Sequence, residues 1–245
     1  MSQWFRRYEP RPSAGVRLLC FPHAGGSAVF YQNWSDRLSP DIELAAVQYP
    51  GRAERFAEPI IDDAPTLVRQ ITTAVLPLCD RPVALFGHSM GAVIAYEVAR
   101  SLQTLGAPPA YLFVSGHRAA HVPGKERYSE QDDDALVETL TGMGGTDAEL
   151  FADPDFREMV LPYVRGDLGL LDAYEHRPQP VLSVPITALI GADDQVEPID
   201  LTARWAELTS GAFTQRVLPG DHFYLVPHRD QVIAEIESRL KQAAA

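Results

Sequence analysis

The stretch that decides the fold is residues 82–93, which read Pro82-Val83-Ala84-Leu85-Phe86-Gly87-His88-Ser89-Met90-Gly91-Ala92-Val93. An apolar run leads into Gly-x-Ser-x-Gly, and a helical pattern follows it. This order predicts a strand, an abrupt turn and a helix, with Ser89 at the apex. In so tight a turn, a side chain at Gly87 or Gly91 would collide with its neighbours. We expect Ser89 to adopt a strained conformation that exposes its hydroxyl at a helix N-terminus, where developing negative charge is favoured.

The chain on either side of this turn alternates between apolar runs and helical patterns. Strands are expected at residues 16–21, 42–48, before the Gly-x-Ser-x-Gly turn and at 111–115, with helices at 27–38, 64–78 and 90–105. Short crossovers of this kind require parallel strands with right-handed connections. We therefore predict an α/β fold with a mostly parallel, doubly wound sheet flanked by helices.

The alternation stops at Gly116 and returns at residue 186. Residues 117–185 show helical patterns at 129–141, 146–151 and 155–174, and Ser129 with Asp132 resembles a helix N-cap box. We predict one domain, with a core of residues 1–116 and 186–245 and a helical insertion of residues 117–185. The insertion either packs onto the core or lies as a lid over the C-terminal edge of the sheet, and we favour the lid.

Two aspartates follow the apolar run at residues 186–190. An acidic residue just after a buried parallel strand lies at the edge of the sheet where ligands bind. In α/β-hydrolases, the acid also follows the serine in chain order. Asp193 and Asp194 both meet these conditions. We favour Asp194, because Gly-x-x-Asp is the spacing associated with the acid loop of these folds, and Asp193 would then cap the next turn.

One of the seven histidines stands out by its position. A helix is expected at residues 199–208 and a late strand at 213–218. His222 lies in the loop after this strand and precedes a helix at 230–240. It is downstream of both Ser89 and Asp194, which gives the order serine, acid, histidine. The other six have local explanations beside the turn, in the insertion or next to the last helix. The sequence therefore predicts His222 as the base that takes the proton of Ser89, with Asp194 holding its tautomer.

A second predicted element is a pair of backbone donors for the oxyanion of a tetrahedral intermediate. Met90, the residue after the nucleophile, supplies one N–H. A second donor must come from elsewhere, and a Gly-rich loop, Pro22-His23-Ala24-Gly25-Gly26, follows the first long strand. We predict that Ala24 supplies it, with Gly25 as the alternative. Together these residues predict acyl transfer through an acyl-serine intermediate.

Composition excludes several other classes. The net charge of −12 is unfavourable for a nucleic-acid partner, and no apolar run approaches the roughly 18 residues of a membrane span. The first residues lack a signal-peptide pattern, so we expect a cytoplasmic protein. No metal-ligand spacing, dinucleotide fingerprint or phosphate loop is present, so we expect no metal and no cofactor. We expect disorder only in the first dozen residues and in the tail at residues 241–245.

Four motifs in this order resemble the type II thioesterases, stand-alone editing enzymes that accompany polyketide synthases and nonribosomal peptide synthetases. They are Phe21-Pro22-His23-Ala24-Gly25-Gly26, Gln48-Tyr49-Pro50-Gly51-Arg52, Gly87-His88-Ser89-Met90-Gly91 and Gly220-Asp221-His222-Phe223-Tyr224. The resemblance spans nearly the whole chain. It implies an α/β-hydrolase core with a helical lid, and hydrolysis of acyl groups from the phosphopantetheine thioester of acyl or peptidyl carrier proteins. One departure is Ala119-Ala120, where such proteins often have Ala-Pro, which bears on the lid hinge.

A carrier-protein partner raises an electrostatic difficulty, because carrier proteins are usually acidic and so is this chain. Docking would need a local basic patch, for which the candidates are Arg52, Arg55, Arg118, Lys125 and Arg127. Arg52 and Arg55 could instead form a solvated loop face. Two other functions fit the same residues: a general carboxylesterase or lipase, and a binding module that uses an intact hydrolase pocket to hold a ligand.

Overall fold

The computed structural model describes residues 3–124, 126–145 and 148–243. In these residues the centre is a seven-stranded sheet in the order β1-β3-β2-β4-β5-β6-β7. Strands β2 to β7 run parallel, and β1 pairs antiparallel with β3 at one edge. The strands are β1 (Phe5–Arg6), β2 (Val16–Phe21), β3 (Ile42–Val47), β4 (Val83–His88), β5 (Tyr111–Ser115), β6 (Ile186–Gly191) and β7 (Phe213–Leu218).

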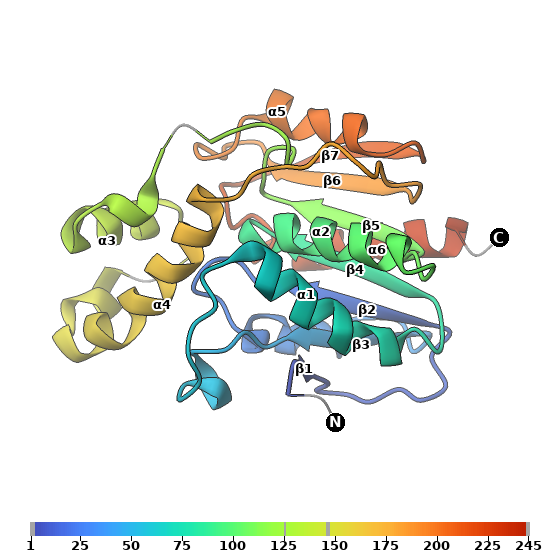
Figure 1. Ribbon diagram of the computed structural model, residues 1–245, viewed down its shortest axis with the longest axis horizontal. Helices are drawn as coiled ribbons and strands as arrows, with labels where there is room; N and C mark the ends of the chain where they lie inside the picture. The colour runs from blue at the N-terminus through green and yellow to red at the C-terminus, as the bar shows by residue number, and fades with distance from the viewer. Residues whose placement is uncertain (1–2, 125, 146–147, 244–245) are drawn as a thin grey trace.

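Helices cover both faces of the sheet, as the alternating pattern predicted (Figure 1). One apolar cluster joins one face to α1 and α2, and a second joins the opposite face to η1 and α6. The α-helices are α1 (Ala64–Val75), α2 (Met90–Thr104), α3 (Asp133–Gly142), α4 (Pro154–Asp172), α5 (Ile199–Ala203) and α6 (Arg229–Ala243). The 3-10 helices are η1 (Ala28–Trp34), η2 (Ala53–Arg55), η3 (Leu76–Leu78), η4 (Tyr128–Glu130), η5 (Ala148–Ala152) and η6 (Arg204–Leu208).

Two expected helices differ in type and length. The expected helix at residues 27–38 is the short 3-10 helix η1, where Asn33, Ser35 and Asp36 have low helix propensity. The expected helix at residues 199–208 divides into α5 and η6. Neither difference changes the strand order.

The turn between β4 and α2 shows why the two glycines are needed. A Cβ built on Gly87 would lie 2.0 Å from the carbonyl oxygen of Gly91, and one on Gly91 would lie 2.1 Å from that of Phe21. Ser89 has a φ of +54°, a backbone conformation that residues other than glycine rarely adopt. The expected strained serine between two obligatory glycines is confirmed.

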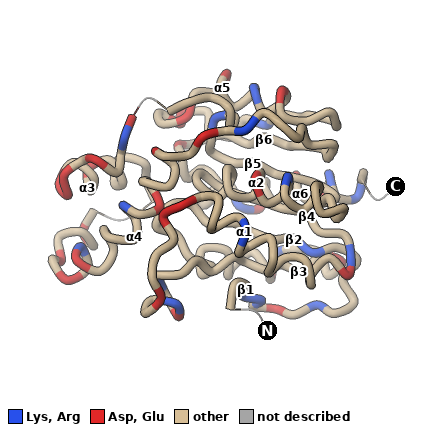
Figure 2. Tube along the Cα trace, viewed as in Figure 1, with Lys and Arg blue, Asp and Glu red and all other residues tan. Residues whose placement is uncertain are grey.

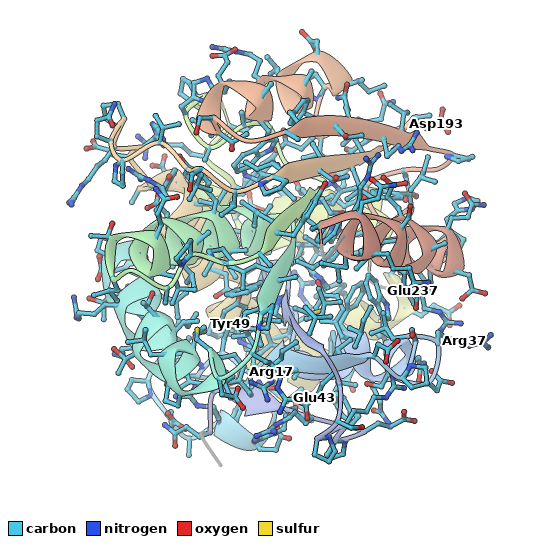
Figure 3. The ribbon with its side chains drawn as sticks, turned by 90° about the vertical axis from the view of Figure 1, so that its right-hand side faces the viewer. Arg17, Arg37, Glu43, Tyr49, Asp193 and Glu237 are labelled. Carbon is cyan, nitrogen blue, oxygen red and sulfur yellow. The ribbon has the colours of Figure 1, made fainter. Side chains whose placement is uncertain are left out.

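A charged pair is buried inside the sheet. Arg17 interrupts the apolar run of β2, and its guanidinium donates to Glu43 of β3 at 2.8 Å (Figure 3). Both side chains are almost fully buried, and Arg17 also donates to Asp80 at 2.7 Å. Because each charge has a partner, the strand can be buried on both faces despite its arginine.

The expectation of disorder at the N-terminus is wrong for the residues that the structure describes. Phe5 pairs with Val47, and Trp4 and Phe5 are both buried. The guanidinium of Arg55 lies 4.2 Å from the ring centroid of Trp4. These aromatic residues cover the edge of β3, which would otherwise be exposed. At the other end, α6 continues to Ala243, so residues 241–243 are helical.

The helical segment between β5 and β6 has its own small apolar cluster, formed mainly by α3, η5 and α4. Figure 1 shows α3 and α4 beyond the carboxyl ends of the strands. The N-cap prediction needs one correction. Asp132 alone caps α3 by accepting from the N–H of Ala135, whereas the hydroxyl of Ser129 donates to Asp172 of α4. No helix in the described part of the chain is long and apolar enough to cross a membrane.

The close approach at the turn generates a stability prediction. Replacing Gly87 with alanine places a methyl group against a backbone oxygen that cannot swing away, and we expect a loss of at least about 3 kcal/mol in the free energy of unfolding. Urea denaturation followed by circular dichroism measures it. Gly15→Ala is the control, because a Cβ there meets nothing within 4 Å. Equal midpoints for the two variants would contradict this close packing of Gly87 against Gly91.

Candidate active site

The predicted nucleophile lies at the wall of a large cavity. Ser89 lines a cavity of about 790 Å³ together with His222, His23 and Ala24. The N–H of Ser89 donates to the carbonyl of Ser115 in the adjacent strand at 2.8 Å, which anchors the turn to the sheet. The serine therefore stands at the carboxyl edge of the sheet, where the sequence placed it.

The structure brings Asp194 and His222 together, although 28 positions separate them. Nδ1 of His222 lies 2.9 Å from Oδ2 of Asp194, and both side chains are buried. The other carboxylate oxygen, Oδ1, accepts from the N–H groups of Val196 at 2.9 Å and Glu197 at 3.0 Å. Three donors therefore fix the carboxylate. An ionised acceptor at Nδ1 favours the tautomer with its proton there, which leaves Nε2 free to act as a base.

The two loops that carry this pair meet closely. A Cβ on Gly191 would lie 2.2 Å from the carbonyl oxygen of Asp221, so glycine is needed where β6 enters the acid loop. Asp193, the alternative acid, lies at the surface (Figure 3), where its N–H donates to the carbonyl of Gly220. The geometry favours Asp194 over Asp193 as the partner of His222. The turn cap expected from Asp193 is instead made by Asp194.

The two candidates for the second oxyanion donor differ in their partners. The N–H of Gly25 donates to Oδ2 of Asp167 at 2.8 Å. Among the described residues, the amides of Ala24 and Met90 have no hydrogen-bond acceptor. An oxyanion donor must be free to bind substrate, so this difference favours Ala24 over Gly25.

Two further histidines surround the site, and both are kept neutral. Burial lowers the pKa of His23 to about 3, with smaller contributions from His222 and Arg52. Burial likewise holds the pKa of His88 well below 6.5. Neither ring therefore carries a charge near neutral pH. Because their pKa values are low, both are weak proton acceptors beside His222.

Sequence reasoning missed the polar chain behind His88. Nδ1 of His88 lies 3.0 Å from Oγ of Ser115, which lies 2.6 Å from the hydroxyl of Tyr224. The ring centroids of His88 and His222 are 5.1 Å apart. The chain thus supports the wall against which the proposed base packs. In the sequence, Tyr224 is the one signal of this polar chain. It follows the Gly-Asp-His-Phe motif, and a tyrosine buried beside that loop needs a hydrogen-bond partner.

The cavity is lined by both apolar and polar side chains. The apolar part of the lining includes side chains of α3, η5 and α4 and of the residue after α3, namely Leu140, Met143, Phe151, Phe156, Val160 and Val164. The polar part of the lining includes His117, His121, Glu126, His176 and Glu197. The cavity therefore offers both kinds of contact to a molecule that reaches Ser89.

The prediction of a basic docking patch is wrong for Arg52, Arg55 and Arg118. All three are buried in ion pairs, with Asp167, Glu58 and Glu197 respectively. Asp167 and Glu197 are far from Arg52 and Arg118 in the sequence, and Glu58 is three residues after Arg55, so the residue types alone did not reveal these pairs. The alternative of a solvated loop face for Arg52 and Arg55 is wrong for the same reason.

Of the remaining candidates, Arg127 is exposed and Lys125 lies outside the described residues. Figure 2 shows acidic residues at the start of α3, where Asp132, Asp133 and Asp134 are exposed. In residues 3–124, 126–145 and 148–243, no group of three or more histidine, cysteine or carboxylate side chains could hold a metal ion.

A doubly wound parallel sheet with a strained serine turn and a histidine–aspartate pair at its carboxyl edge defines the α/β-hydrolase class. The thioesterase domain family matches residues 16–240. The chain therefore belongs to the thioesterase family, which hydrolyses thioesters, and the expected fold and enzyme class are confirmed.

Individual relatives agree with the resemblance seen in the motifs. The chain is 41% identical to the probable cadicidin biosynthesis thioesterase of Streptomyces griseus over 98% of its own length and 66% of that relative's length. The solved structure of BorB, a type II thioesterase from the borrelidin biosynthetic cluster, is 40% identical, with a TM-score of 0.89 over 97% of both chains. YbtT, a type II thioesterase from the yersiniabactin NRPS/PKS pathway, is 27% identical, with a TM-score of 0.90 over 99% of this chain and 100% of that one. The resemblance to type II thioesterases is confirmed.

The low pKa of His23 predicts how stability changes with pH. The folded protein keeps His23 neutral down to about pH 3, whereas the unfolded chain takes up a proton below about 6.5. Because the unfolded state then binds more protons, stability falls as the pH falls. From pH 7 to pH 5, His23 should cost about 2 kcal/mol, given 1.36 kcal/mol per pKa unit.

Urea denaturation at both pH values, with wild type and His23→Gln, measures this cost. The variant should lose about 2 kcal/mol less than wild type over the same interval. The absolute stability of the variant does not matter, because the difference in pH dependence is the measured quantity. Identical losses in the two proteins would show that the folded protein does not hold His23 neutral.

Proposed function

We propose that this chain is a thioesterase that hydrolyses acyl groups from the phosphopantetheine thioester of acyl or peptidyl carrier proteins. It would thereby remove stalled or wrongly loaded chains from a polyketide or nonribosomal peptide assembly line. The observation that carries the proposal is the hydrogen bond between His222 and Asp194 beside the cavity that Ser89 lines. The relatives named for such clusters support the choice of partner.

The proposed reaction uses side chains and backbone amides of this chain. Nε2 of His222 takes the proton of Ser89 as Oγ attacks the thioester carbonyl. The N–H groups of Met90 and Ala24 hold the oxyanion. The carbon–sulfur bond then breaks, and the pantetheine thiol leaves with the proton from His222. Water, deprotonated by the same histidine, attacks the acyl-serine, and the acid is released as Oγ regains its proton.

The two parts of the cavity lining fit the two ends of this substrate. The apolar part would take the acyl chain, and the polar part would take the amide-containing pantetheine arm. We propose that residues 117–185 act as a lid on a core of residues 1–116 and 186–245, since α4 supplies much of the apolar wall. Location in the cytoplasm, where such carrier proteins would meet it, stays a prediction.

The residue roles can be tested on a small acyl-thioester. Ser89→Ala and His222→Ala should lower kcat by at least about 10³-fold, and Asp194→Asn by about 10⁴-fold, because the histidine would lose its correct tautomer. Asp193→Asn is the matched control and should keep kcat within about threefold. Undiminished turnover by Ser89→Ala, or an equal loss in both aspartate variants, would overturn these assignments.

The substrate class is tested by presenting one acyl group in three forms: on a holo carrier protein, on a short thiol and as an oxygen ester. We expect kcat/KM to be highest for the carrier protein and lowest for the oxygen ester. A preference for the oxygen ester would favour the carboxylesterase alternative. Turnover near the uncatalysed rate with tight binding would favour the binding module.

Docking is tested separately, because most of the expected basic patch is buried. Charge reversal at Arg127, the exposed candidate, should raise KM for the acyl-carrier protein and leave KM for the short thioester unchanged. Equal effects on both substrates would remove Arg127 from the docking surface.

A further inference from the structure

A buried carboxylate of α4 contacts the loop that carries the proposed oxyanion donor. Asp167 is 3% exposed in its side chain and forms a two-pronged ion pair with Arg52, also 3% exposed. One oxygen, Oδ1, accepts from the guanidinium at 2.7 Å, and the other, Oδ2, accepts both from the guanidinium and from the N–H of Gly25 at 2.8 Å. A carboxylate with three such donors is held in one orientation.

The arginine of the pair holds the same loop at the next residue. Arg52 donates to the carbonyl oxygen of Gly26 at 3.3 Å. Its guanidinium carbon lies 5.4 Å from the ring centroid of Tyr49 and 4.9 Å from that of Tyr163. The loop also closes on itself, because the N–H of Gly26 donates to the carbonyl of His23 at 2.9 Å. The ion pair therefore fixes the N–H of Gly25 and the carbonyl of Gly26, directly after Ala24.

Apolar packing brings α4 against this loop as well. A Cβ on Gly25 would lie 2.7 Å from Cγ2 of Val164, which precedes Asp167 by about one helical turn. Ile60 contacts the same helix, since a Cβ on Gly166 would lie 2.9 Å from its Cγ2. The position of α4 and that of the loop are thus coupled both sterically and electrostatically.

We propose that Asp167, held by Arg52, is a positioning residue for the oxyanion hole: by accepting the N–H of Gly25 it aims the free N–H of Ala24 at the reacting carbonyl. This inference rests on the proposed function. It gives α4 a role beyond covering the site, because displacement of the helix would release the loop and switch off oxyanion binding. Arg52 has a second effect, since it neutralises a carboxylate that would otherwise repel the developing oxyanion.

Two double variants separate positioning from the ion pair itself. Arg52→Met with Asp167→Asn removes both charges and keeps an acceptor for Gly25, whereas Arg52→Met with Asp167→Leu removes both charges and the acceptor. Asn and Leu are close in size, and removing both members of a buried pair costs far less stability than removing one. The two variants therefore differ chiefly in the Gly25 contact.

The measurements are kcat and KM with a short acyl-thioester, the inhibition constant of an alkyl boronic acid that forms a tetrahedral adduct with serine, and the thermal midpoint. The leucine variant should lose about 10- to 100-fold in kcat, with KM within about threefold, because a displaced donor weakens binding of the oxyanion alone. Its boronate inhibition constant should rise by a similar factor. The asparagine variant should keep kcat within about threefold.

A control for substitution on α4 itself is the more exposed ion pair between Arg157 of α4 and Asp134 of α3, at 2.6 Å, which does not involve the loop. Arg157→Met with Asp134→Leu should leave kcat and boronate binding unchanged. If a double variant fails to fold, the same comparison of asparagine with leucine at position 167 is made with Arg52→Leu, which also removes both charges, and the leucine variant should again be the slower by at least tenfold.

Equal kcat in the asparagine and leucine variants, or a loss of kcat with unchanged boronate binding, would overturn the inference. Loss of activity in Ser89→Ala together with wild-type activity in the leucine variant would remove the inference and leave the proposed function standing. Full activity in Ser89→Ala would remove the proposed function itself.

Discussion

The rest of the structure depends on the close approach of three backbone segments where β4 turns into α2. The carbonyl oxygens of Gly91 and Phe21 occupy the space that side chains at Gly87 and Gly91 would need. This contact forces Ser89 into a positive φ, and the strain is tolerated because β2, β4 and β5 hold the turn on every side. The serine therefore faces the carboxyl edge of the sheet, where the loops carrying His23, Asp194 and His222 also end.

Around this turn, charge is managed by pairing rather than by exposure. Arg17 in the sheet, Arg52 under the Gly-rich loop and Arg118 beside the cavity each meet a buried carboxylate. Next to His222, burial keeps the rings of His23 and His88 neutral. In such surroundings a single carboxylate on His222 and two backbone amides have a large electrostatic effect on a reacting carbonyl. Asp167 takes part in both the buried ion pairs and the site. It is the buried partner of Arg52, and it accepts from the N–H of Gly25 in the loop that carries the proposed oxyanion donor.

Much of the fold was accessible from the sequence because it is encoded locally. Apolar runs followed by glycine-containing loops marked the parallel strands from β2 to β6, and the Gly-x-Ser-x-Gly turn followed from the order of strand, serine and helix. The antiparallel β1 was missed, since two residues carry no periodicity and Phe5 is ordered only by its pairing with Val47. The prediction that Ser129 and Asp132 together cap α3 was wrong for Ser129, because its hydrogen-bond partner, Asp172, lies 43 positions away on α4.

The sequence by itself determined the sheet, the strained serine and a short list of candidate acids, bases and donors, because these depend on residue type and on neighbours within a few positions. The tertiary structure decided between near-equivalent candidates. Asp194 rather than Asp193 contacts His222, and the N–H of Gly25 is taken by Asp167 while that of Ala24 stays free among the described residues. It also buried Arg52 and Arg55, which no local pattern distinguished from surface arginines. Such choices depend on which distant side chain fills a particular space, and that is set only when the packed elements meet.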